Sequence, residues 1–238
     1  MRIDILGVGF DNVTMAEALA CGEEFLCGEG THYVVTPNPE IVETCRENEE
    51  ASRAVNGASL VLPDGIGVIY GAKMLGTPLK ERVPGIEFGT AMVEKCALLG
   101  KSVYLLGAKP GVAEAAARNL RKRFVGLKIA GTHDGYFKED APVAAEVKAS
   151  GADMALVCLG APKQEKWMHA NAKKLNVGLM IGAGGSLDVF AGVAERAPEG
   201  WQKAGLEWLY RLLREPKRIG RMMSIPKFMF QILFMRKK

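Results

Sequence analysis

Short apolar runs alternate with longer amphipathic segments along most of this chain. Apolar runs of this kind are typical of buried β-strands, and segments with apolar residues every three or four positions are typical of α-helices. We expect strands at residues 3–8, 32–35, 59–62, 102–106, 127–130, 154–159 and 177–181. We expect helices between them at residues 14–27, 41–48, 50–56, 68–75, 86–99, 112–124, 142–149 and 164–175. This alternation predicts an α/β fold with a mostly parallel, Rossmann-like sheet and helices on both of its faces.

The C-terminal segment has a different pattern. Residues 205–214 have one apolar and one polar face, as in an amphipathic helix, and residues 226–238 are apolar on almost every side. Arginines recur through this segment at helical spacings, at Arg211, Arg214, Arg218 and Arg221. We therefore predict a chain of two parts, an α/β core at residues 1–195 and a helical, basic appendage at residues 196–238.

The net charge of +4 is unevenly distributed. From Trp201 onward the chain has ten basic and two acidic residues, so the part before Trp201 has a net charge of −4. The basic residues of the appendage are interleaved with Met, Leu, Ile and Phe, which favours an anionic membrane surface as partner and argues against nucleic acid. No apolar run reaches the roughly 20 residues of a membrane span, so we predict reversible attachment. A helix buried in a dimer interface is the alternative interpretation of residues 226–238.

Cysteine usage and the N-terminus bear on location. The five cysteines include no CxxC pair and no zinc-like spacing, which is typical of reduced thiols in a cytosolic protein. The N-terminal apolar stretch is short and contains Asp4, unlike a signal peptide. These features predict a cytoplasmic protein, and the basic appendage predicts peripheral binding to a membrane.

Several polar side chains follow predicted strands. Asp64 comes after one strand in the motif LVLPDGIG, and Thr36 and Asn38 come after its neighbour. Gln164 and Glu165 begin a helix after a third strand. Each has an ordinary structural interpretation, because Asp-Gly makes turns, Asn caps helices and polar residues suit a first helical turn. Their convergence at one edge of the sheet, where ligand crevices lie, favours a catalytic carboxylate at Asp64 and a binding site around it.

The glycine-rich turns and the lack of metal motifs indicate which cofactors the protein could use. Turns at residues 7–9, 107–111 and 182–185 follow predicted strands, but none matches GxGxxG in its context. A nucleotide-cofactor oxidoreductase therefore remains an alternative with weak support. No DxD motif occurs and the three histidines lack ligand spacing, so we expect no metal or other cofactor. Arginines must then neutralise any diphosphate, and Arg82 and the C-terminal arginines are the candidates.

Eight motifs, in their order along the chain, resemble those of the WecG/TagA/CpsF glycosyltransferases. They are TPNPE (36–40), LPDGIG (62–67), RVPG (82–85), GYF (135–137), GAPKQEKW (160–167), GAGGSLDVFAG (182–192), RAP (196–198) and GLEWLYRLLREPKRIGR (205–221). The resemblance covers nearly the whole chain. Within the family the pattern is most similar to the TagA branch, which transfers N-acetylmannosamine in wall teichoic acid synthesis.

The resemblance implies an inverting hexosyltransferase. N-acetylmannosamine would pass from its UDP donor to the 4-hydroxyl of undecaprenyl-diphosphate-linked GlcNAc in a β linkage, at the inner face of the cell membrane. Other family members use different UDP-sugars, such as the uronic acid form, and the residues leave this choice open. The resemblance also implies self-association into a homo-oligomer.

The resemblance further assigns roles to individual residues. Asp64 corresponds to the general base, and Thr36 and Asn38 correspond to active-site polar groups. Arg82 and Gln164 correspond to donor-binding residues. The appendage arginines that would reach the diphosphate correspond to Arg211, Arg218 and Arg221.

Overall fold

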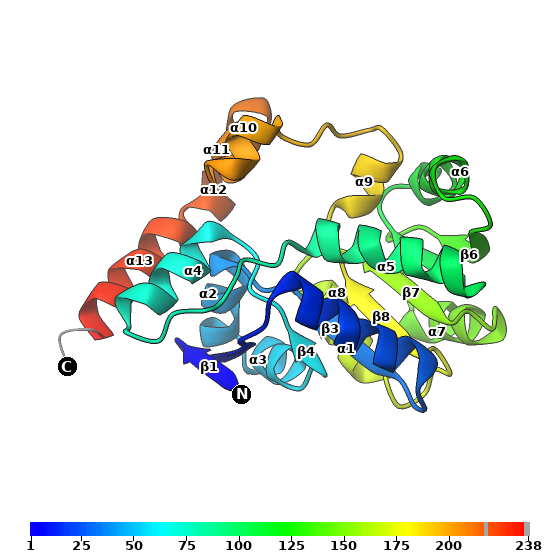
Figure 1. The fold of residues 1–238 in the computed structure, drawn as a ribbon, viewed down its shortest axis with the longest axis horizontal. Helices are drawn as coiled ribbons and strands as arrows, with labels where there is room; N and C mark the ends of the chain where they lie inside the picture. The colour runs from blue at the N-terminus through cyan, green and yellow to red at the C-terminus, as the bar shows by residue number, and fades with distance from the viewer. Residues whose placement is uncertain (217–218, 236–238) are drawn as a thin grey trace.

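The computed structural model describes residues 1–216 and 219–235, and its centre is one sheet of six strands (Figure 1). The strands are β3 (His32–Val35), β4 (Leu60–Val61), β5 (Ser102–Gly107), β6 (Lys128–His133), β7 (Met154–Cys158) and β8 (Leu179–Gly182). They lie in the order β4-β3-β8-β7-β5-β6, and every neighbouring pair is parallel. The predicted α/β class and parallel sheet are confirmed.

Helices cover both faces of this sheet, as predicted. One face packs against α1 (Met15–Cys27), α5 (Gly85–Leu99), α6 (Val112–Arg123) and α9 (Ser186–Phe190). The other packs against α2 (Pro39–Glu47), α3 (Glu49–Asn56), α4 (Ile66–Met74), α7 (Asp140–Ala149) and α8 (Lys163–Asn171). Successive strand residues point to opposite faces, so Val34 and Val35 enter different core clusters. Burial on both sides explains why the inner strands β7 and β8 are wholly apolar, whereas the edge strand β6 is only partly buried and includes Lys128, Thr132 and His133.

The N-terminus differs from the prediction of a single strand at residues 3–8. It forms a hairpin of β1 (Arg2–Ile5) and β2 (Val8–Asp11), which is antiparallel and separate from the main sheet. Leu6 and Gly7 both have positive φ, at 56° and 87°, which is the backbone of a tight two-residue hairpin turn. Asp11 ties this hairpin to the sheet, because its Oδ2 accepts a 2.8 Å hydrogen bond from the Val61 amide.

Side chains cap the first turns of two helices, and α2 begins at Pro39, two residues before the expected start at residue 41. In the capping box of α1, the Thr14 hydroxyl accepts from the Glu17 amide at 3.2 Å and the Glu17 carboxylate accepts from the Thr14 amide at 2.7 Å. At α2, Asn38 Oδ1 accepts from the Ile41 amide at 3.1 Å, and Pro39 is the first helical residue.

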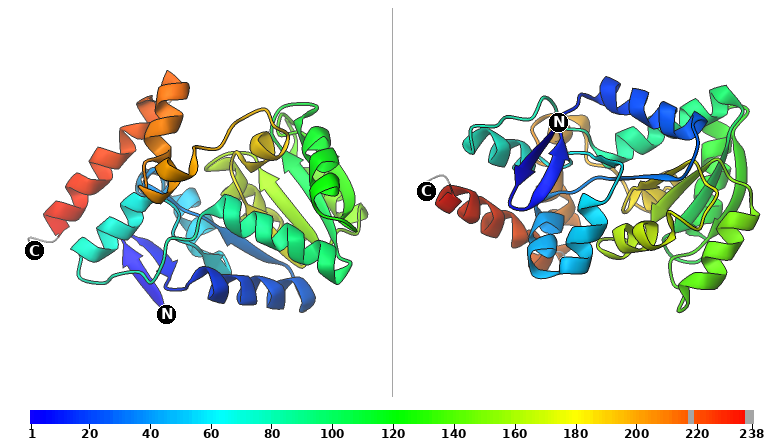
Figure 2. Two further views of the ribbon diagram at one scale, coloured as in Figure 1. Left: turned by 45° about the horizontal axis from the view of Figure 1, so that its top comes forward. Right: turned by 90° about the horizontal axis from the view of Figure 1, so that it is seen from below.

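The described residues of the C-terminal segment form the helices α10 (Glu199–Lys203), α11 (Glu207–Arg214), α12 (Ile219–Met222) and α13 (Ser224–Met235). The last of these runs beside α2 and α4 (Figure 2). Phe228 and Ile232 of α13 are fully buried there, and a Cβ placed on Gly71 of α4 would lie 2.9 Å from the Phe228 ring. Residues 226–235 therefore have a core-facing side, which the all-round apolar pattern did not reveal.

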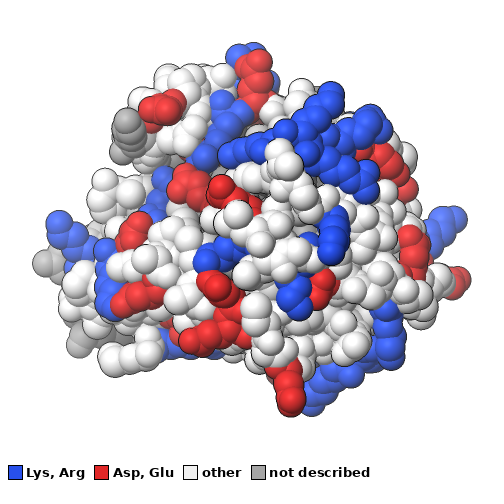
Figure 3. Space-filling model, turned by 45° about the vertical axis from the view of Figure 1, so that its right-hand side comes forward, with Lys and Arg blue, Asp and Glu red and all other residues white. Residues whose placement is uncertain are grey.

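Two other surface properties bear on membrane binding. No helix in the described part of the chain combines the length and apolar character that crossing a bilayer requires. Basic side chains are not confined to the appendage. Figure 3 shows Lys and Arg gathered at the upper edge of one face of the molecule, and the last turn of α6 contributes Arg121, Lys122 and Arg123 to the basic surface of the core. The boundary at residue 195 stays a prediction.

Candidate active site

A cavity of about 670 Å³ opens at the carboxyl ends of the parallel strands. The core contributes most of its lining, and the C-terminal segment closes one side with Gly205, Glu207, Trp208, Arg221 and Met222. Six predicted site residues line it together: Thr36, Asn38, Asp64, Arg82, Gln164 and Arg221. Arg218 and the side chain of Arg211 lie outside what the structure describes.

Asp64 follows β4 and is held by backbone on two sides. Its amide donates to the Pro37 carbonyl at 3.2 Å, and its Oδ2 accepts from the Gly85 amide at 3.2 Å. Arg82 Nε lies 3.9 Å from Asp64 Oδ1. Burial raises the pKa of Asp64 above its ordinary value, and the Arg82 charge opposes that shift. A fixed carboxylate with a raised pKa is suited to accept a proton from a substrate hydroxyl.

Thr36, Asn38 and Gln164 each make a hydrogen bond within the fold, and that of Asn38 is the helix cap that its ordinary interpretation predicts. The Thr36 hydroxyl donates to the Gly182 carbonyl at 3.2 Å, and Asn38 caps α2. Gln164 Oε1 accepts from the Gly184 amide at 3.1 Å. All three still line the cavity, so their structural bonds hold them at its wall.

Glu165 does not line the cavity, contrary to the sequence prediction. It is fully buried behind Gln164, whose Nε2 donates to Glu165 Oε1 at 2.9 Å. Burial raises the pKa of Glu165 to about 7, and Glu40 adds to the shift. Glu165 therefore orients the amide of Gln164 from behind.

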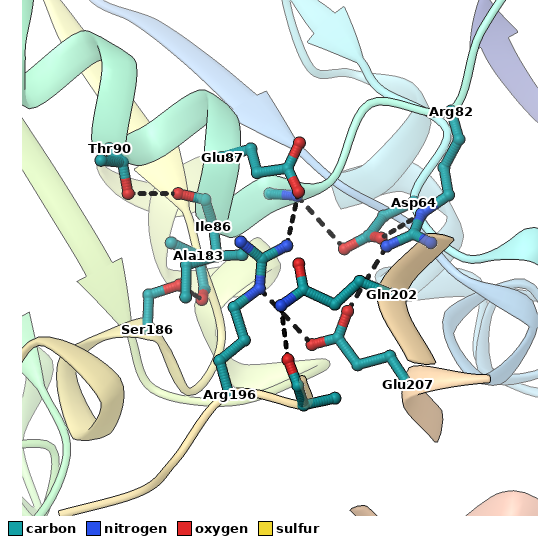
Figure 4. A network of polar contacts seen from close by, with 12 residues as sticks. Asp64, Arg82, Ile86, Glu87, Thr90, Ala183, Ser186, Arg196, Gln202 and Glu207 are labelled. Atoms are coloured by element: carbon teal, nitrogen blue, oxygen red, sulfur yellow. Dashed lines mark hydrogen bonds and ion pairs between the residues drawn. The ribbon is translucent and has the colours of Figure 1, made fainter. Parts of the chain in front are cut away.

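Two charged residues, Glu207 in the cavity wall and Arg196 in the wall of a neighbouring cavity of about 380 Å³, were not singled out from the sequence. Glu207 of α11 points between two arginines, with its Oε2 at 3.5 Å from Arg82 Nη2 and its Oε1 at 3.9 Å from Arg196 Nε (Figure 4). Arg196 also pairs with Glu87 of α5. Both new residues lie within the motifs RAP and GLEW, but only the folded chain brings them to Arg82, which is more than a hundred residues away in sequence.

Arg221 of α12 reaches the rim of the cavity. Its Nε lies 2.6 Å from Glu40 Oε1, in the first turn of α2. Among the described residues of the C-terminal segment, the cavity is thus lined by one arginine and one carboxylate, Arg221 and Glu207. A role for Arg221 in binding a diphosphate stays a prediction.

Two of the three predicted glycine-rich turns, after β5 and β8, also meet at this cavity, whereas the turn at residues 7–9 belongs to the separate β1–β2 hairpin. Ala108 and Lys109 after β5, Gly160 after β7 and Gly184 after β8 all line it. A Cβ on Gly107 would lie 2.2 Å from the Cys158 carbonyl oxygen, so close strand packing requires glycine there. Across the described ranges, no group of three or more His, Cys, Asp or Glu side chains is placed to hold a metal ion.

A carboxylate fixed at the strand ends of a parallel α/β sheet, with arginines beside it, is an arrangement suited to transferring a group from a phosphate-containing donor. Comparison with known proteins agrees. The model of the glycosyl transferase WecG/TagA/CpsF family matches residues 3–238, and the chain belongs to this family. It is therefore a glycosyltransferase, and the resemblance found in the sequence is confirmed.

Two curated relatives come from Staphylococcus aureus strains MW2 and NCTC 8325 / PS 47. Both are named N-acetylglucosaminyldiphosphoundecaprenol N-acetyl-beta-D-mannosaminyltransferase. Each is 38% identical over 240 residues, covering 100% of this chain and 94% of the relative. Neither the family nor these relatives support the alternative of a nucleotide-cofactor oxidoreductase.

Proposed function

We propose that this chain transfers N-acetylmannosamine from a UDP donor to N-acetylglucosaminyl-diphospho-undecaprenol, forming a β1,4 linkage in wall teichoic acid linkage-unit synthesis. Support comes from the family and from relatives that carry the name of this reaction along the full length of the chain. The observation that carries the proposal is the fixed carboxylate of Asp64 in the cavity at the strand ends.

A single displacement accounts for the reaction. Asp64 accepts the proton of the acceptor 4-hydroxyl while the oxygen of that hydroxyl attacks the anomeric carbon of the donor sugar. The bond from that carbon to the diphosphate oxygen breaks, and UDP leaves with the bonding electron pair. One carboxylate suffices, because the hydroxyl attacks from the side of the sugar opposite to the leaving UDP and inverts the configuration of the anomeric carbon in one step.

The other predicted site residues bind and orient the substrates. Arg82 and Gln164 hold the donor, and Thr36 and Asn38 position the reacting groups at the ends of the strands. Arginines neutralise the charge that develops on the leaving diphosphate, so the proposed reaction needs no metal ion. The appendage arginines Arg211, Arg218 and Arg221 are proposed to approach the diphosphate of the lipid acceptor.

A lipid-linked acceptor places the proposed reaction at the inner face of the cell membrane. The side of α12 and α13 that faces away from the core exposes large apolar residues: Ile219, Met223, Phe230, Leu233, Phe234 and Met235. Such side chains enter the headgroup boundary while nearby Lys and Arg meet anionic lipid. The C-terminal segment thus supports peripheral attachment. Self-association stays a prediction, to be checked by light scattering.

A donor panel tests the proposal. The purified chain is incubated with a short-chain lipid-linked GlcNAc diphosphate and, separately, UDP-N-acetylmannosamine, its uronic acid form or UDP-GlcNAc. We expect release of UDP and a disaccharide product only with UDP-N-acetylmannosamine. Turnover of the uronic acid donor instead would assign the other family reaction, and reduction of NAD without sugar transfer would contradict the proposal.

A further inference from the structure

Five charged side chains form a continuous row from the catalytic carboxylate to α5. They are Asp64, Arg82, Glu207, Arg196 and Glu87, joined by successive ion pairs (Figure 4). Three carboxylates and two guanidinium groups give this row a net charge of −1. Within the row the carboxylates outnumber the guanidinium groups, so displacing one carboxylate makes the row more favourable for an anion.

The contacts of Glu207 with the two arginines are loose. Its carboxylate lies 3.5 Å from Arg82 and 3.9 Å from Arg196, whereas charge-assisted hydrogen bonds from arginine to carboxylate are about 2.7–2.9 Å long. The Nε groups of both arginines are buried and have no hydrogen-bond partner among the described residues. Unsatisfied buried donors destabilise a fold, so a ligand with more acceptor oxygens than one carboxylate would bind favourably to these two arginines.

The helix that carries Glu207 is weakly held. Residues 191–198, which lead into α10, contain no helix or strand. Between residues 199 and 216, Gly205 is the one residue that is buried among those whose burial the structure describes. By contrast, α13 is anchored by the buried Phe228 and Ile232. Few buried contacts make α10 and α11, like α12, which has no buried residue, less costly to move than α13.

From these observations we propose that Arg82 and Arg196 form a diphosphate site, the arginine clasp, and that Glu207 occupies it until a substrate diphosphate displaces the carboxylate. Once Glu207 leaves, the four remaining side chains of the row are neutral in sum, and the two guanidinium groups bridge the phosphate oxygens. The choice of a diphosphate rests on the proposed function, because both the UDP donor and the lipid-linked acceptor carry one. Arg196 is thereby a further binding residue, and Glu207 is its internal competitor.

Calorimetric titration of the full chain with inorganic pyrophosphate, UDP and farnesyl diphosphate, at one fixed ionic strength, tests this proposal. Glu207→Gln removes the competing charge without changing side-chain size, so we expect it to bind pyrophosphate about tenfold more tightly, a change of about 1.4 kcal/mol. Arg196→Gln removes one binding group and is expected to bind about tenfold more weakly. Tighter binding of UDP by Glu207→Gln assigns the site to the donor, and tighter binding of farnesyl diphosphate assigns it to the acceptor.

Matched controls carry the same changes of charge at exposed positions. Glu49→Gln, with 84% of its side chain exposed, and Arg53→Gln, with 61% exposed, are expected to bind pyrophosphate like the wild type. If Glu207 merely supports Arg82 structurally, Glu207→Gln binds more weakly, and that sign overturns the proposal. An unchanged affinity, or no binding by any variant at millimolar pyrophosphate, overturns it as well.

The outcome separates this inference from the proposed function. If the variants show the expected changes in pyrophosphate affinity but the chain transfers no sugar, the arginine clasp is supported and the proposed reaction is contradicted. If the chain transfers N-acetylmannosamine but Glu207→Gln leaves the binding of pyrophosphate, UDP and farnesyl diphosphate unchanged, the proposed reaction is supported and the arginine clasp is contradicted.

Discussion

The fixed position of α13 depends on Phe228, whose ring is fully buried against Gly71 of α4. Phe228→Ala removes the ring and leaves a cavity, which for a fully buried phenylalanine costs about 3–5 kcal/mol of unfolding free energy. For a chain of this length the melting temperature falls by about 2–4 °C per kcal/mol, so we expect a loss of roughly 6–20 °C. Urea unfolding followed by tryptophan fluorescence, with calorimetry as a second probe, measures both quantities.

Phe230 of the same helix provides the matched control. Its side chain is 60% exposed, so Phe230→Ala is expected to change the unfolding free energy by less than about 0.5 kcal/mol. If Phe228→Ala loses less than about 1 kcal/mol, or no more than Phe230→Ala, then α13 is not packed on α2 and α4 in solution.

Three further predictions concern pH, metal and membrane. The pKa of Glu165 is about 7 in the folded chain and near 4.5 in the unfolded chain, so the folded chain binds more protons between these two pH values. The unfolding free energy therefore falls by about 3 kcal/mol in all as the pH rises from 4.5 to 7. Glu165→Gln should remove this part of the pH dependence, measured by urea unfolding from pH 5 to 8. A chelator such as EDTA should leave the transfer rate unchanged, measured by UDP release after dialysis. Phe230→Ala combined with Phe234→Ala should weaken binding to anionic vesicles at least tenfold in sedimentation assays, because both rings are more than half exposed and their centroids lie 4.5 Å apart, in one apolar patch.

Each of these has a result that contradicts it. A pH slope that persists in Glu165→Gln would mean that another group titrates on unfolding. Loss of transfer in EDTA that Mg²⁺ or Mn²⁺ restores would assign a metal to the reaction. Vesicle binding that survives the double substitution would move the membrane contact away from α13, for example to the basic end of α6.

Local sequence predicted most of the fold because local rules determine it. Strands buried on both sides appear in the sequence as continuous apolar runs. The side chains of Thr14 and Asn38 cap helices by accepting hydrogen bonds from amides only three residues further along the chain. The N-terminal hairpin was missed because its turn, Leu6–Gly7, lies within one apolar run and carries a single glycine as its signal.

The site was predicted in part, and the missing part depends on tertiary contacts. Asp64, Thr36, Asn38 and Gln164 share a cavity because parallel strands end at the same edge, which the strand pattern alone implies. No local pattern places Glu207 beside Arg82, since that contact depends on the path of the C-terminal segment across the core. For the same reason the sequence could not show which side of α13 faces α2.

Transfer by Asp64→Asn measures the central claim most directly. Asparagine keeps the size of the side chain and still offers an oxygen to the Gly85 amide, but it does not accept a proton from the acceptor hydroxyl. With UDP-N-acetylmannosamine and a short-chain lipid-linked GlcNAc diphosphate, we expect the rate to fall by about 10²–10⁴-fold, while UDP binding stays within about threefold of wild type. A rate within tenfold of wild type would remove Asp64 from the mechanism and contradict the account.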